Sequence, residues 1–127
     1  MGNDFVLGDR ELDVMSVLWD LGSGTVAEVR AQLPADLAYT TVLTILRNLD
    51  AKGLVSHASE GKAHRYSPRV GRRTARRNAL SQVIDKLFHG SPEQLLAHLV
   101  EERALSAEDL KRLNAQLKAR ERKARKP

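Results

Sequence analysis

The spacing of apolar side chains changes twice along this chain. Up to Gly53 it follows a period of about 3.6 residues, which is typical of amphipathic helices, and from Gly53 to Pro68 it follows a period of about 2, which is typical of strands. From residue 74 to about residue 120 the helical period returns without an intervening strand. The pattern therefore predicts a mainly α fold with a small β-hairpin between two helical segments.

Two short helices are predicted before Pro34. Residues 8–22 form the first, with Asp9 placed to cap its start, and the spacing of Thr25 and Glu28 is that of a capping box at the start of the second. Proline disfavours helix at the residue before it, so the second helix stops there. The side chains expected to be buried are Leu12, Met15, Leu18 and Trp19 in the first helix and Val26, Val29 and Leu33 in the second.

A third helix is predicted in AYTTVLTILRNLDAKGLV, residues 38–55, with Gly53 in a C-cap position after its last turn. One face of this helix is apolar and consists of Val42, Ile45, Leu46 and Leu49. The opposite face is polar and consists of Thr40, Thr41, Thr44, Arg47 and Asn48. Threonine is a weaker helix former than Glu, Lys or Ala because its branched side chain is stiff, so this polar face predicts a role other than folding.

The segment after Gly53 predicts a β-hairpin. LVSHA and AHRYS are two short runs with strand alternation, separated by the turn-type tetrapeptide SEGK and closed by Pro68. Three short helices followed by a hairpin are the layout of a winged helix-turn-helix. We therefore expect residues 1–72 to form an N-terminal winged-helix DNA-binding domain.

Residues 73–127 predict a C-terminal helical dimerisation domain. The basic stretch GRRTARR leads into a helix that ends at Gly90, Ser91 caps a second helix, and Ser106 with Asp109 opens a third. About fifty residues bury too little surface to fold alone, so we expect the apolar stripes to pair with those of a second copy across a two-fold axis. The terminal KARERKARKP has almost no apolar side chain and is expected to fray into solvent. The stripe residues are Leu80, Val83, Ile84, Leu87, Phe88, Leu95, Leu96, Leu99, Val100, Leu110, Leu113 and Leu117.

The polar face of the third helix has the chemistry of a DNA-reading surface. In a helix-turn-helix the second helix of the motif enters the major groove, with its N-terminal residues nearest to the base edges. Threonine offers a hydroxyl to phosphates or bases and a methyl to the thymine methyl, and arginine reaches guanine or phosphate. A charged hairpin tip can lie along the flanking phosphates or in the minor groove. The candidate DNA-binding residues are Tyr39, Thr40, Thr41, Thr44, Arg47 and Asn48 in the helix and Lys62 and Arg65 in the hairpin.

The charge of the chain suggests a polyanionic partner but does not locate the binding surface. The formal net charge of the 127 residues is +5. Residues 1–67 contain six Lys/Arg and nine Asp/Glu, whereas residues 68–127 contain fifteen and seven. The predicted DNA-reading helix therefore lies in the acidic part of the chain.

The sequence lacks the motifs of an enzyme, a metal site or a membrane protein. It has no cysteine, and its four histidines, His57, His64, His89 and His98, lack metal-ligand spacing, so neither a metal nor a cofactor is expected. No phosphate-binding loop, nucleophile elbow or HExxH motif is present, and we expect no enzymatic activity. No apolar run approaches the ~18 residues of a membrane-spanning helix, and no secretory signal pattern is found, so a cytoplasmic protein without a membrane partner is expected.

Several stretches resemble the penicillinase and methicillin-resistance repressors, the BlaI/MecI family of winged-helix regulators. They are LGDRELDVMSVLW, TVAEV, YTTVLTIL, KGLV and AHRYSP, and more loosely the helical C-terminus to about Leu117. The resemblance implies a homodimeric transcriptional repressor that binds an inverted-repeat, double-stranded operator DNA through its winged domains, with antibiotic or cell-envelope stress response genes as candidate targets. The recognition positions of the family fall on Tyr39, Thr40, Thr41 and Thr44, followed by Arg47 and Asn48.

The sequence also departs from the family pattern. Family members often have a basic residue in place of Leu43, an Arg in place of Asn48 and a Lys in place of Ala51, so a different or relaxed operator sequence is expected. In the antibiotic-responsive members a regulatory protease cuts between an Asn and a Phe. The matching place is approximately His98 and Leu99, where this scissile pair is absent, so another protease or another signal is a candidate. The copper-responsive branch carries a cysteine cluster that this chain lacks.

Two other functions fit parts of the sequence. A winged fold can dock a protein partner while the helical tail assembles a complex, and the acidic balance of residues 1–67 favours this slightly. Sequence-independent DNA binding through the basic tail, residues 118–126, is a further alternative. An exposed threonine face or hairpin tip can also be merely solvated, but the complete helix-turn-helix and hairpin pattern favours DNA contact.

Overall fold

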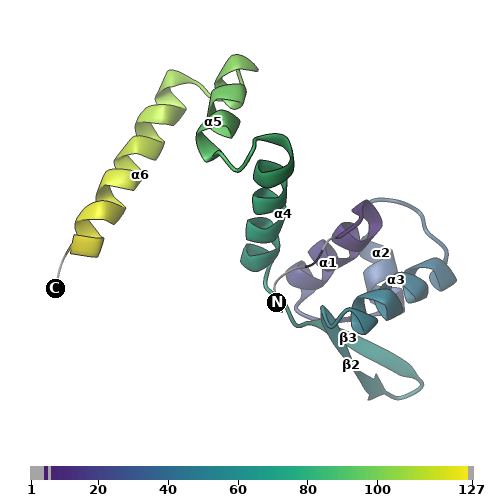
Figure 1. Cartoon of the computed structure of the whole chain (residues 1–127). Helices are drawn as coiled ribbons and strands as arrows, with labels where there is room; N and C mark the ends of the chain where they lie inside the picture. The colour runs from purple at the N-terminus through teal and green to yellow at the C-terminus, as the bar shows by residue number, and fades with distance from the viewer. Residues whose placement is uncertain (1–4, 6, 126–127) are drawn as a thin grey trace. The chain divides into compact units, whose positions relative to one another are not determined.

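The computed structural model describes Phe5 and residues 7–125, which form helices and a small sheet (Figure 1). The described chain forms two compact units, of which the first ends at Leu80 and the second begins at Ser81. The predicted fold class, mainly α with a small β-hairpin, is confirmed. The elements in chain order are α1 (Asp9–Leu21), β1 (Gly24–Thr25), α2 (Val26–Gln32), α3 (Tyr39–Ala51), β2 (Val55–Glu60), β3 (Ala63–Pro68), α4 (Arg72–Leu87), α5 (Pro92–Glu101) and α6 (Ala107–Arg125).

The predicted hairpin is formed by β2 and β3, which pair antiparallel up to Glu60 opposite Ala63. Its turn consists of Gly61 and Lys62, so both strands are longer than expected and the tetrapeptide SEGK is not all turn. Gly61 adopts a φ of 62°, a left-handed conformation that glycine reaches without a Cβ clash and that the twist of a tight hairpin requires. In Figure 1 the base of this hairpin lies beside α1, α2 and α3, and its tip projects away from them.

A third strand, β1, was not expected from the sequence. It contains only Gly24 and Thr25, and it pairs antiparallel with β3, where Thr25 lies opposite Arg65. The strand order is therefore β1-β3-β2. Two residues are too few to show strand alternation, so only the tertiary pairing reveals this strand.

The core of the first unit lies between the three helices and the base of the hairpin. On α1 the predicted buried face is partly wrong, because Leu12 is 44% exposed whereas Val14 and Val17 are buried. Val14, Val17 and Leu18 also have helical spacing, and the contacts of α1 with α3 and β3 select this stripe. Trp19 is partly buried and packs against the core from its edge. The core residues are Val14, Met15, Val17, Leu18, Val26, Val29, Val42, Ile45, Leu46, Leu49, Leu54, Val55 and Tyr66.

In both α1 and α2, the glutamate three residues after the N-cap stabilises the start of the helix. In α1 the N-cap is Gly8, not Asp9 as predicted, and its N–H donates to Glu11 Oε1 over 3.1 Å. The predicted capping box of α2 is confirmed: Glu28 N–H donates to Thr25 Oγ1 over 3.2 Å, and Thr25 N–H donates to Glu28 Oε1 over 3.0 Å. These contacts satisfy N–H groups that have no partner within the helix.

The C-terminal end of α3 is closed and tied to α1. Gly53 follows the C-cap with a φ of 78°, and Leu54 N–H donates to Leu49 O over 3.0 Å, as in a Schellman motif. Next to it, Lys52 Nζ lies 2.8 Å from Glu11 Oε2 at the start of α1. Burial by itself would raise the pKa of Glu11, but the hydrogen bonds from Lys52 and Gly8 outweigh it and lower this pKa below its usual value.

The first unit extends further along the chain than the predicted boundary at residue 72. Trp19 Nε1 donates to Val70 O over 2.8 Å, and the guanidinium of Arg72 lies 5.4 Å from the centre of the Trp19 ring. Arg72 also donates to Asp20 over 2.7 Å, and Ala75 is buried. These contacts fix the first turns of α4 on α1, so the division between the units falls within α4.

The second unit has little interior of its own. Ser91 caps α5 through its Oγ, which accepts from Gln94 N–H over 3.2 Å, and Ser106 with Asp109 forms the predicted start of α6. The Ser106 N–H and hydroxyl lower the pKa of Asp109. No residue of α5 or α6 is buried within the described part of the chain. Across residues 5 and 7–125, no helix combines the length and the apolar character needed to span a bilayer.

The described part of the C-terminal tail is helical, since α6 continues to Arg125, where the sequence predicts fraying into solvent. Arg122, Lys123 and Arg125 lie in its last turn, where positive side chains are favourable beside the negative end of the helix dipole. At the other end, Glu108 and Asp109 lie in the first turn, where negative side chains are favourable. The charge distribution thus supports helix in a tail that has almost no apolar side chain.

Candidate nucleic-acid interface

The two faces of α3 are divided as the sequence predicts. Val42, Ile45, Leu46 and Leu49 are buried and fix α3 against α1, α2 and β2. On the opposite face, Thr40, Thr41, Thr44, Arg47 and Asn48 are all exposed. Four buried aliphatic side chains thus fix the orientation of a polar surface that takes no part in the core.

The N-terminal end of α3 is open. Its N-cap is Ala38, which offers no side-chain hydrogen bond, and its first turn contains no acidic residue. By contrast, α1, α2, α5 and α6 all carry an acidic side chain in the first turn. Backbone N–H groups at a helix start carry partial positive charge, so this end of α3 is electrostatically suited to an anion such as a phosphate. Tyr39 stands at the same end and is exposed.

The hydroxyl of Thr44 has a partner within the helix. Its Oγ1 donates to Thr40 O over 2.9 Å, which fixes the side-chain rotamer. The oxygen lone pairs and the methyl group of Thr44 stay available on the exposed face. Thr44 can therefore accept a hydrogen bond or pack on a thymine methyl, but donating its proton would require breaking the bond to Thr40.

Arg47 and Lys62 are the cationic side chains that stay unpaired among the predicted contact residues. Neither forms an ion pair with a carboxylate of the described residues, and both are exposed. Arg47 lies on the polar face of α3, and Lys62 lies in the turn at the hairpin tip. Their positive charges are therefore free for an external anion.

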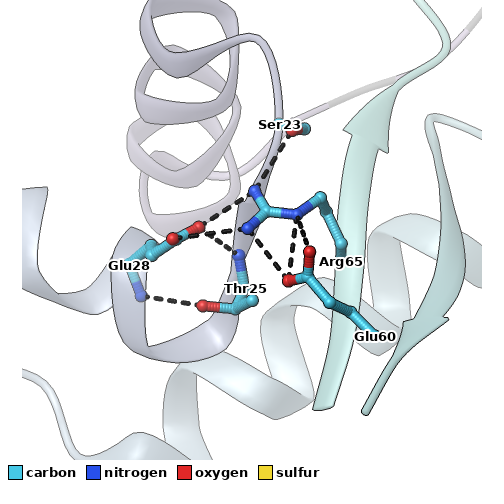
Figure 2. A network of polar contacts seen from close by, with 5 residues as sticks. All are labelled: Ser23, Thr25, Glu28, Glu60 and Arg65. Carbon is cyan, nitrogen blue, oxygen red and sulfur yellow. Dashed lines mark hydrogen bonds and ion pairs between the residues drawn. The ribbon is translucent and has the colours of Figure 1, made fainter.

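Arg65 has a different environment from the one the sequence suggests (Figure 2). Its Nε donates to both carboxylate oxygens of Glu60 over 3.2 Å, and its Nη2 lies 3.0 Å from Glu60 Oε2. Its Nη1 lies 3.0 Å from Glu28 Oε1 and 3.2 Å from Ser23 Oγ. The Thr25 N–H and the Arg65 guanidinium hold the pKa of Glu28 below its usual value, and Glu60 and Glu28 raise the pKa of Arg65.

A second cluster, not predicted from the sequence, joins the hairpin to α3. His57 Nδ1 lies 2.5 Å from Asp50 Oδ2, and the His57 ring stacks on His64 with 4.7 Å between centres. The phenol of Tyr66 is buried beside them, and this burial, together with the nearby Asp50 charge, raises the pKa of Tyr66. His57 and His64 thus make contacts within the fold.

The partners of Arg65 and His57 were missed because their pairing is tertiary. Glu60 and Arg65 are near neighbours across the hairpin, so an exact hairpin register could have indicated that pair. The contacts of Glu28 with Arg65 and of Asp50 with His57 join separate elements and leave no pattern in the sequence. In the described part of the chain, no three His, Asp or Glu side chains gather closely enough to hold a metal ion.

A helix-turn-helix with an exposed polar second helix, followed by a hairpin, defines the class of winged-helix DNA-binding proteins. Comparisons with known proteins agree with this class. The penicillinase repressor family matches residues 7–119, which is most of the chain. The protein belongs to the penicillinase repressor family.

Two relatives support this assignment at the level of whole chains. The transcriptional regulator BlaI of Mycobacterium tuberculosis is 41% identical over 121 residues, which cover 89% of this chain and 86% of the relative. The penicillinase repressor of Bacillus licheniformis is 27% identical over 109 residues, which cover 84% and 85%.

Solved structures agree with the fold. The solution structure of the DNA-binding domain of the repressor BlaI matches with a TM-score of 0.50 and 31% identity, covering 54% of this chain and 85% of that one. A MarR family protein from Bacillus stearothermophilus matches with a TM-score of 0.50 and 16% identity, covering 96% and 78%, and it supports the fold alone. The resemblance to the BlaI/MecI repressors is thus confirmed, as is the expectation of a transcriptional repressor and not an enzyme.

Proposed function

We propose that this repressor binds a palindromic operator as a homodimer and reads it with the exposed face of α3. The observation that carries the proposal is the division of α3, whose buried face is fixed by four aliphatic side chains while its polar face and open N-terminus point into solvent. The proposed DNA-contact residues are Tyr39, Thr40, Thr41, Thr44, Arg47 and Asn48, with Lys62 on a flanking phosphate. The two unpaired cations among them match the charge of the DNA backbone.

The apolar surface of the second unit supports the homodimer. Several of its aliphatic side chains are between 40% and 70% exposed. One open groove, lined by residues of α5 and α6, has a volume of about 610 Å³. This groove is lined by Leu96, Leu110, Leu113 and Leu117 among others. A two-fold axis through such a surface would cover it and would give each half of a palindrome its own α3. The side chains in question are Val83, Leu87, Leu96, Val100, Leu113 and Leu117, with Ile84, Phe88, Leu95, Leu99 and Leu110 less exposed. Leu80, the last residue of the first unit, is 52% exposed.

The operator-binding part of the proposal is tested by selection from a random duplex library with the purified full-length protein. We expect an inverted repeat to emerge, and the selected duplex then serves in gel shifts with Thr44→Ala and Arg47→Ala. Each variant should lose about 1–3 kcal/mol of specific binding. The matched control is Arg73→Gln, which removes a positive charge from an exposed position on α4. Unchanged affinity in both α3 variants would show that α3 does not read this DNA.

The dimer is tested by sedimentation with Leu113→Asp. A charge in the proposed interface should shift the protein from dimer to monomer, because burying an unpaired carboxylate is costly. Leu12→Asp is the matched control, since Leu12 is 44% exposed in the first unit and Leu113 is 46% exposed in α6. A monomeric wild type, or equal effects of the two substitutions, would contradict the assignment of the interface.

The alternatives from the sequence make different predictions. Deleting residues 118–127 should leave the sequence preference intact if α3 reads the operator, whereas binding driven by the basic tail should be lost. Failure of the selection to yield any preferred sequence would favour a protein-interaction module. A cytoplasmic location, stress-response genes as targets and cleavage by a regulatory protease near His98 and Leu99 remain predictions. His98 lies on α5, where its side chain is exposed and its Nε2 lies 3.7 Å from Glu102 Oε1.

A further inference from the structure

We propose that Arg65 is a positioning residue for DNA binding, and that it acts by fixing the hairpin to α2 through Glu28 and Glu60. This inference rests on the proposed function, because it concerns how the hairpin tip is presented to the operator. It replaces the expectation from the sequence that Arg65 lies along a flanking phosphate. Figure 2 shows the arrangement, with Arg65 reaching from β3 between the two carboxylates.

The first argument is that the guanidinium nitrogens of Arg65 already have hydrogen-bond partners. Nε and Nη2 donate to Glu60, and Nη1 donates to Ser23 and lies within ion-pair distance of Glu28. A phosphate could bind this guanidinium only by displacing a carboxylate that already matches its geometry. The side chain of Arg65 is also only 32% exposed, whereas those of Glu28 and Glu60 are 50% and 55% exposed. The group that faces solvent at this place is therefore negative, which is unsuited to direct phosphate contact.

The second argument is the set of elements that Arg65 joins. Its backbone pairs with Thr25 in β1, directly before α2, and its side chain contacts Glu28 in the first turn of α2. Glu28 also closes the capping box of α2, so one carboxylate fixes both the helix start and the hairpin. Glu60 ends β2 beside the turn that carries Lys62. The network therefore links the hairpin tip to the first helix of the helix-turn-helix.

The two roles for Arg65 predict opposite changes in DNA affinity for the substitution Glu28→Gln. Glu28→Gln keeps an amide oxygen that can accept from the Thr25 N–H, but it removes a negative charge and weakens the contact with Arg65. If Arg65 bound phosphate, this change would release the guanidinium, reduce repulsion and strengthen DNA binding. If Arg65 positions the hairpin, the same change loosens the link between hairpin and α2 and weakens specific binding.

The substitution Arg65→Lys distinguishes the two roles of Arg65 in a second way. Lysine keeps the positive charge but lacks the planar fork that contacts Glu60, Glu28 and Ser23 together. A phosphate contact would survive this change in large part, whereas the positioning role would not. The variants Arg65→Lys, Arg65→Gln and Glu28→Gln are therefore measured as full-length proteins against the selected duplex and against an unrelated duplex of the same length. Thermal unfolding of each variant confirms that it is folded.

We expect all three variants to lose about three- to tenfold in affinity for the selected duplex, with a smaller loss on the unrelated duplex. Arg73→Gln, which removes a charge from an exposed site on α4, should lower both affinities alike. Tighter binding by Glu28→Gln, or full retention of affinity by Arg65→Lys, would overturn the proposal in favour of a phosphate contact. Unchanged affinity in all three variants would overturn it as well, since the hairpin would then need no fixing.

A measurement without DNA separates this proposal from the proposed function. Amide hydrogen exchange in residues 60–66 reports the local stability of the hairpin whether or not a duplex has been selected. We expect Arg65→Gln and Glu28→Gln each to accelerate exchange there, and exchange within α3 to be less affected. If exchange in the hairpin is unchanged, the proposed link is wrong even when the operator is found. If exchange accelerates but no operator is found, the link stands and the DNA function fails.

Discussion

The ion pair between Glu11 and Lys52 joins the start of α1 to the end of α3, and we expect its removal to destabilise the first unit in a pH-dependent way. Lys52 Nζ lies 2.9 Å and 2.8 Å from the two carboxylate oxygens of Glu11. Glu11→Gln removes the charge but retains an oxygen for the Gly8 N–H, and Lys52→Met retains most of the aliphatic stem. The two variants therefore isolate the charge interaction with little change in packing.

The expected magnitude follows from the exposure of the two side chains. Exposed pairs contribute about 0.2–1 kcal/mol, and breaking a buried pair costs about 3–5 kcal/mol. Glu11 is 17% exposed and Lys52 is 44% exposed, so solvent screens the pair on the Lys52 side. We therefore expect a coupling energy of about 1 kcal/mol, which for a domain of this size corresponds to a shift in Tm of about 4–8 °C.

The pH dependence follows from the direction of the Glu11 shift. Burial favours a higher pKa, but the Lys52 and Gly8 hydrogen bonds prevail, so the pKa in the folded state lies below the usual value of 4.5. The unfolded state therefore binds a proton before the folded state does as the pH falls. The stabilisation by the pair should be complete above pH 4.5 and should be lost as the pH falls through the lowered folded pKa.

The assay is a double-mutant cycle of urea unfolding for the wild type, both single variants and the double variant. It is run at pH 7 and again at the lowest pH at which the wild type remains folded. A coupling energy near zero at pH 7 would show that the pair contributes nothing. A coupling energy that does not decrease in acid would show that the stabilisation does not come from the Glu11 carboxylate.

Three further substitutions test the contacts that hold α3 and α4 in place. Leu46→Ala removes a fully buried side chain of α3 and should lower the free energy of unfolding by about 3–5 kcal/mol in urea titrations, so that a loss below 1 kcal/mol would contradict the core assignment. Gly53→Ala places a Cβ at a φ of 78° and should cost about 1 kcal/mol or more in the same assay, with no loss expected if this turn relaxes freely. Trp19→Phe removes the 2.8 Å hydrogen bond to Val70 O and should cost about 1–2 kcal/mol, while amide exchange in the first turns of α4 accelerates.

Much of the fold could be predicted from local patterns. The capping box at Thr25, the buried stripe of α3 and the left-handed glycine after its last turn each depend on residues a few positions apart. Such signals are complete within one helical turn, so they are readable without any tertiary information. The exposed face of α3 followed directly, because a helix that buries one face must present the other.

The structure differs from the expectations where a local pattern allowed more than one solution. On α1 two overlapping stripes have helical spacing, and the packing of α3 and β3 buries Val14 and Val17 instead of Leu12. The tail lacks apolar residues, yet α6 continues to Arg125 because its charges suit the helix dipole. Neither the packing of α3 and β3 on α1 nor the effect of the charges in α6 is evident from the spacing of apolar residues, yet each determines the folded structure.

The sequence by itself determined the class of fold, the family resemblance and which face of α3 is exposed. Only the tertiary structure decided which charged side chains are available on that side of the molecule. Arg47 and Lys62 stay unpaired among the described residues, whereas Arg65 is held by Glu28 and Glu60. The physical reason is that helix and strand periods are local properties of the chain, while the neutralisation of a charge depends on partners from distant segments that folding brings within a few ångströms.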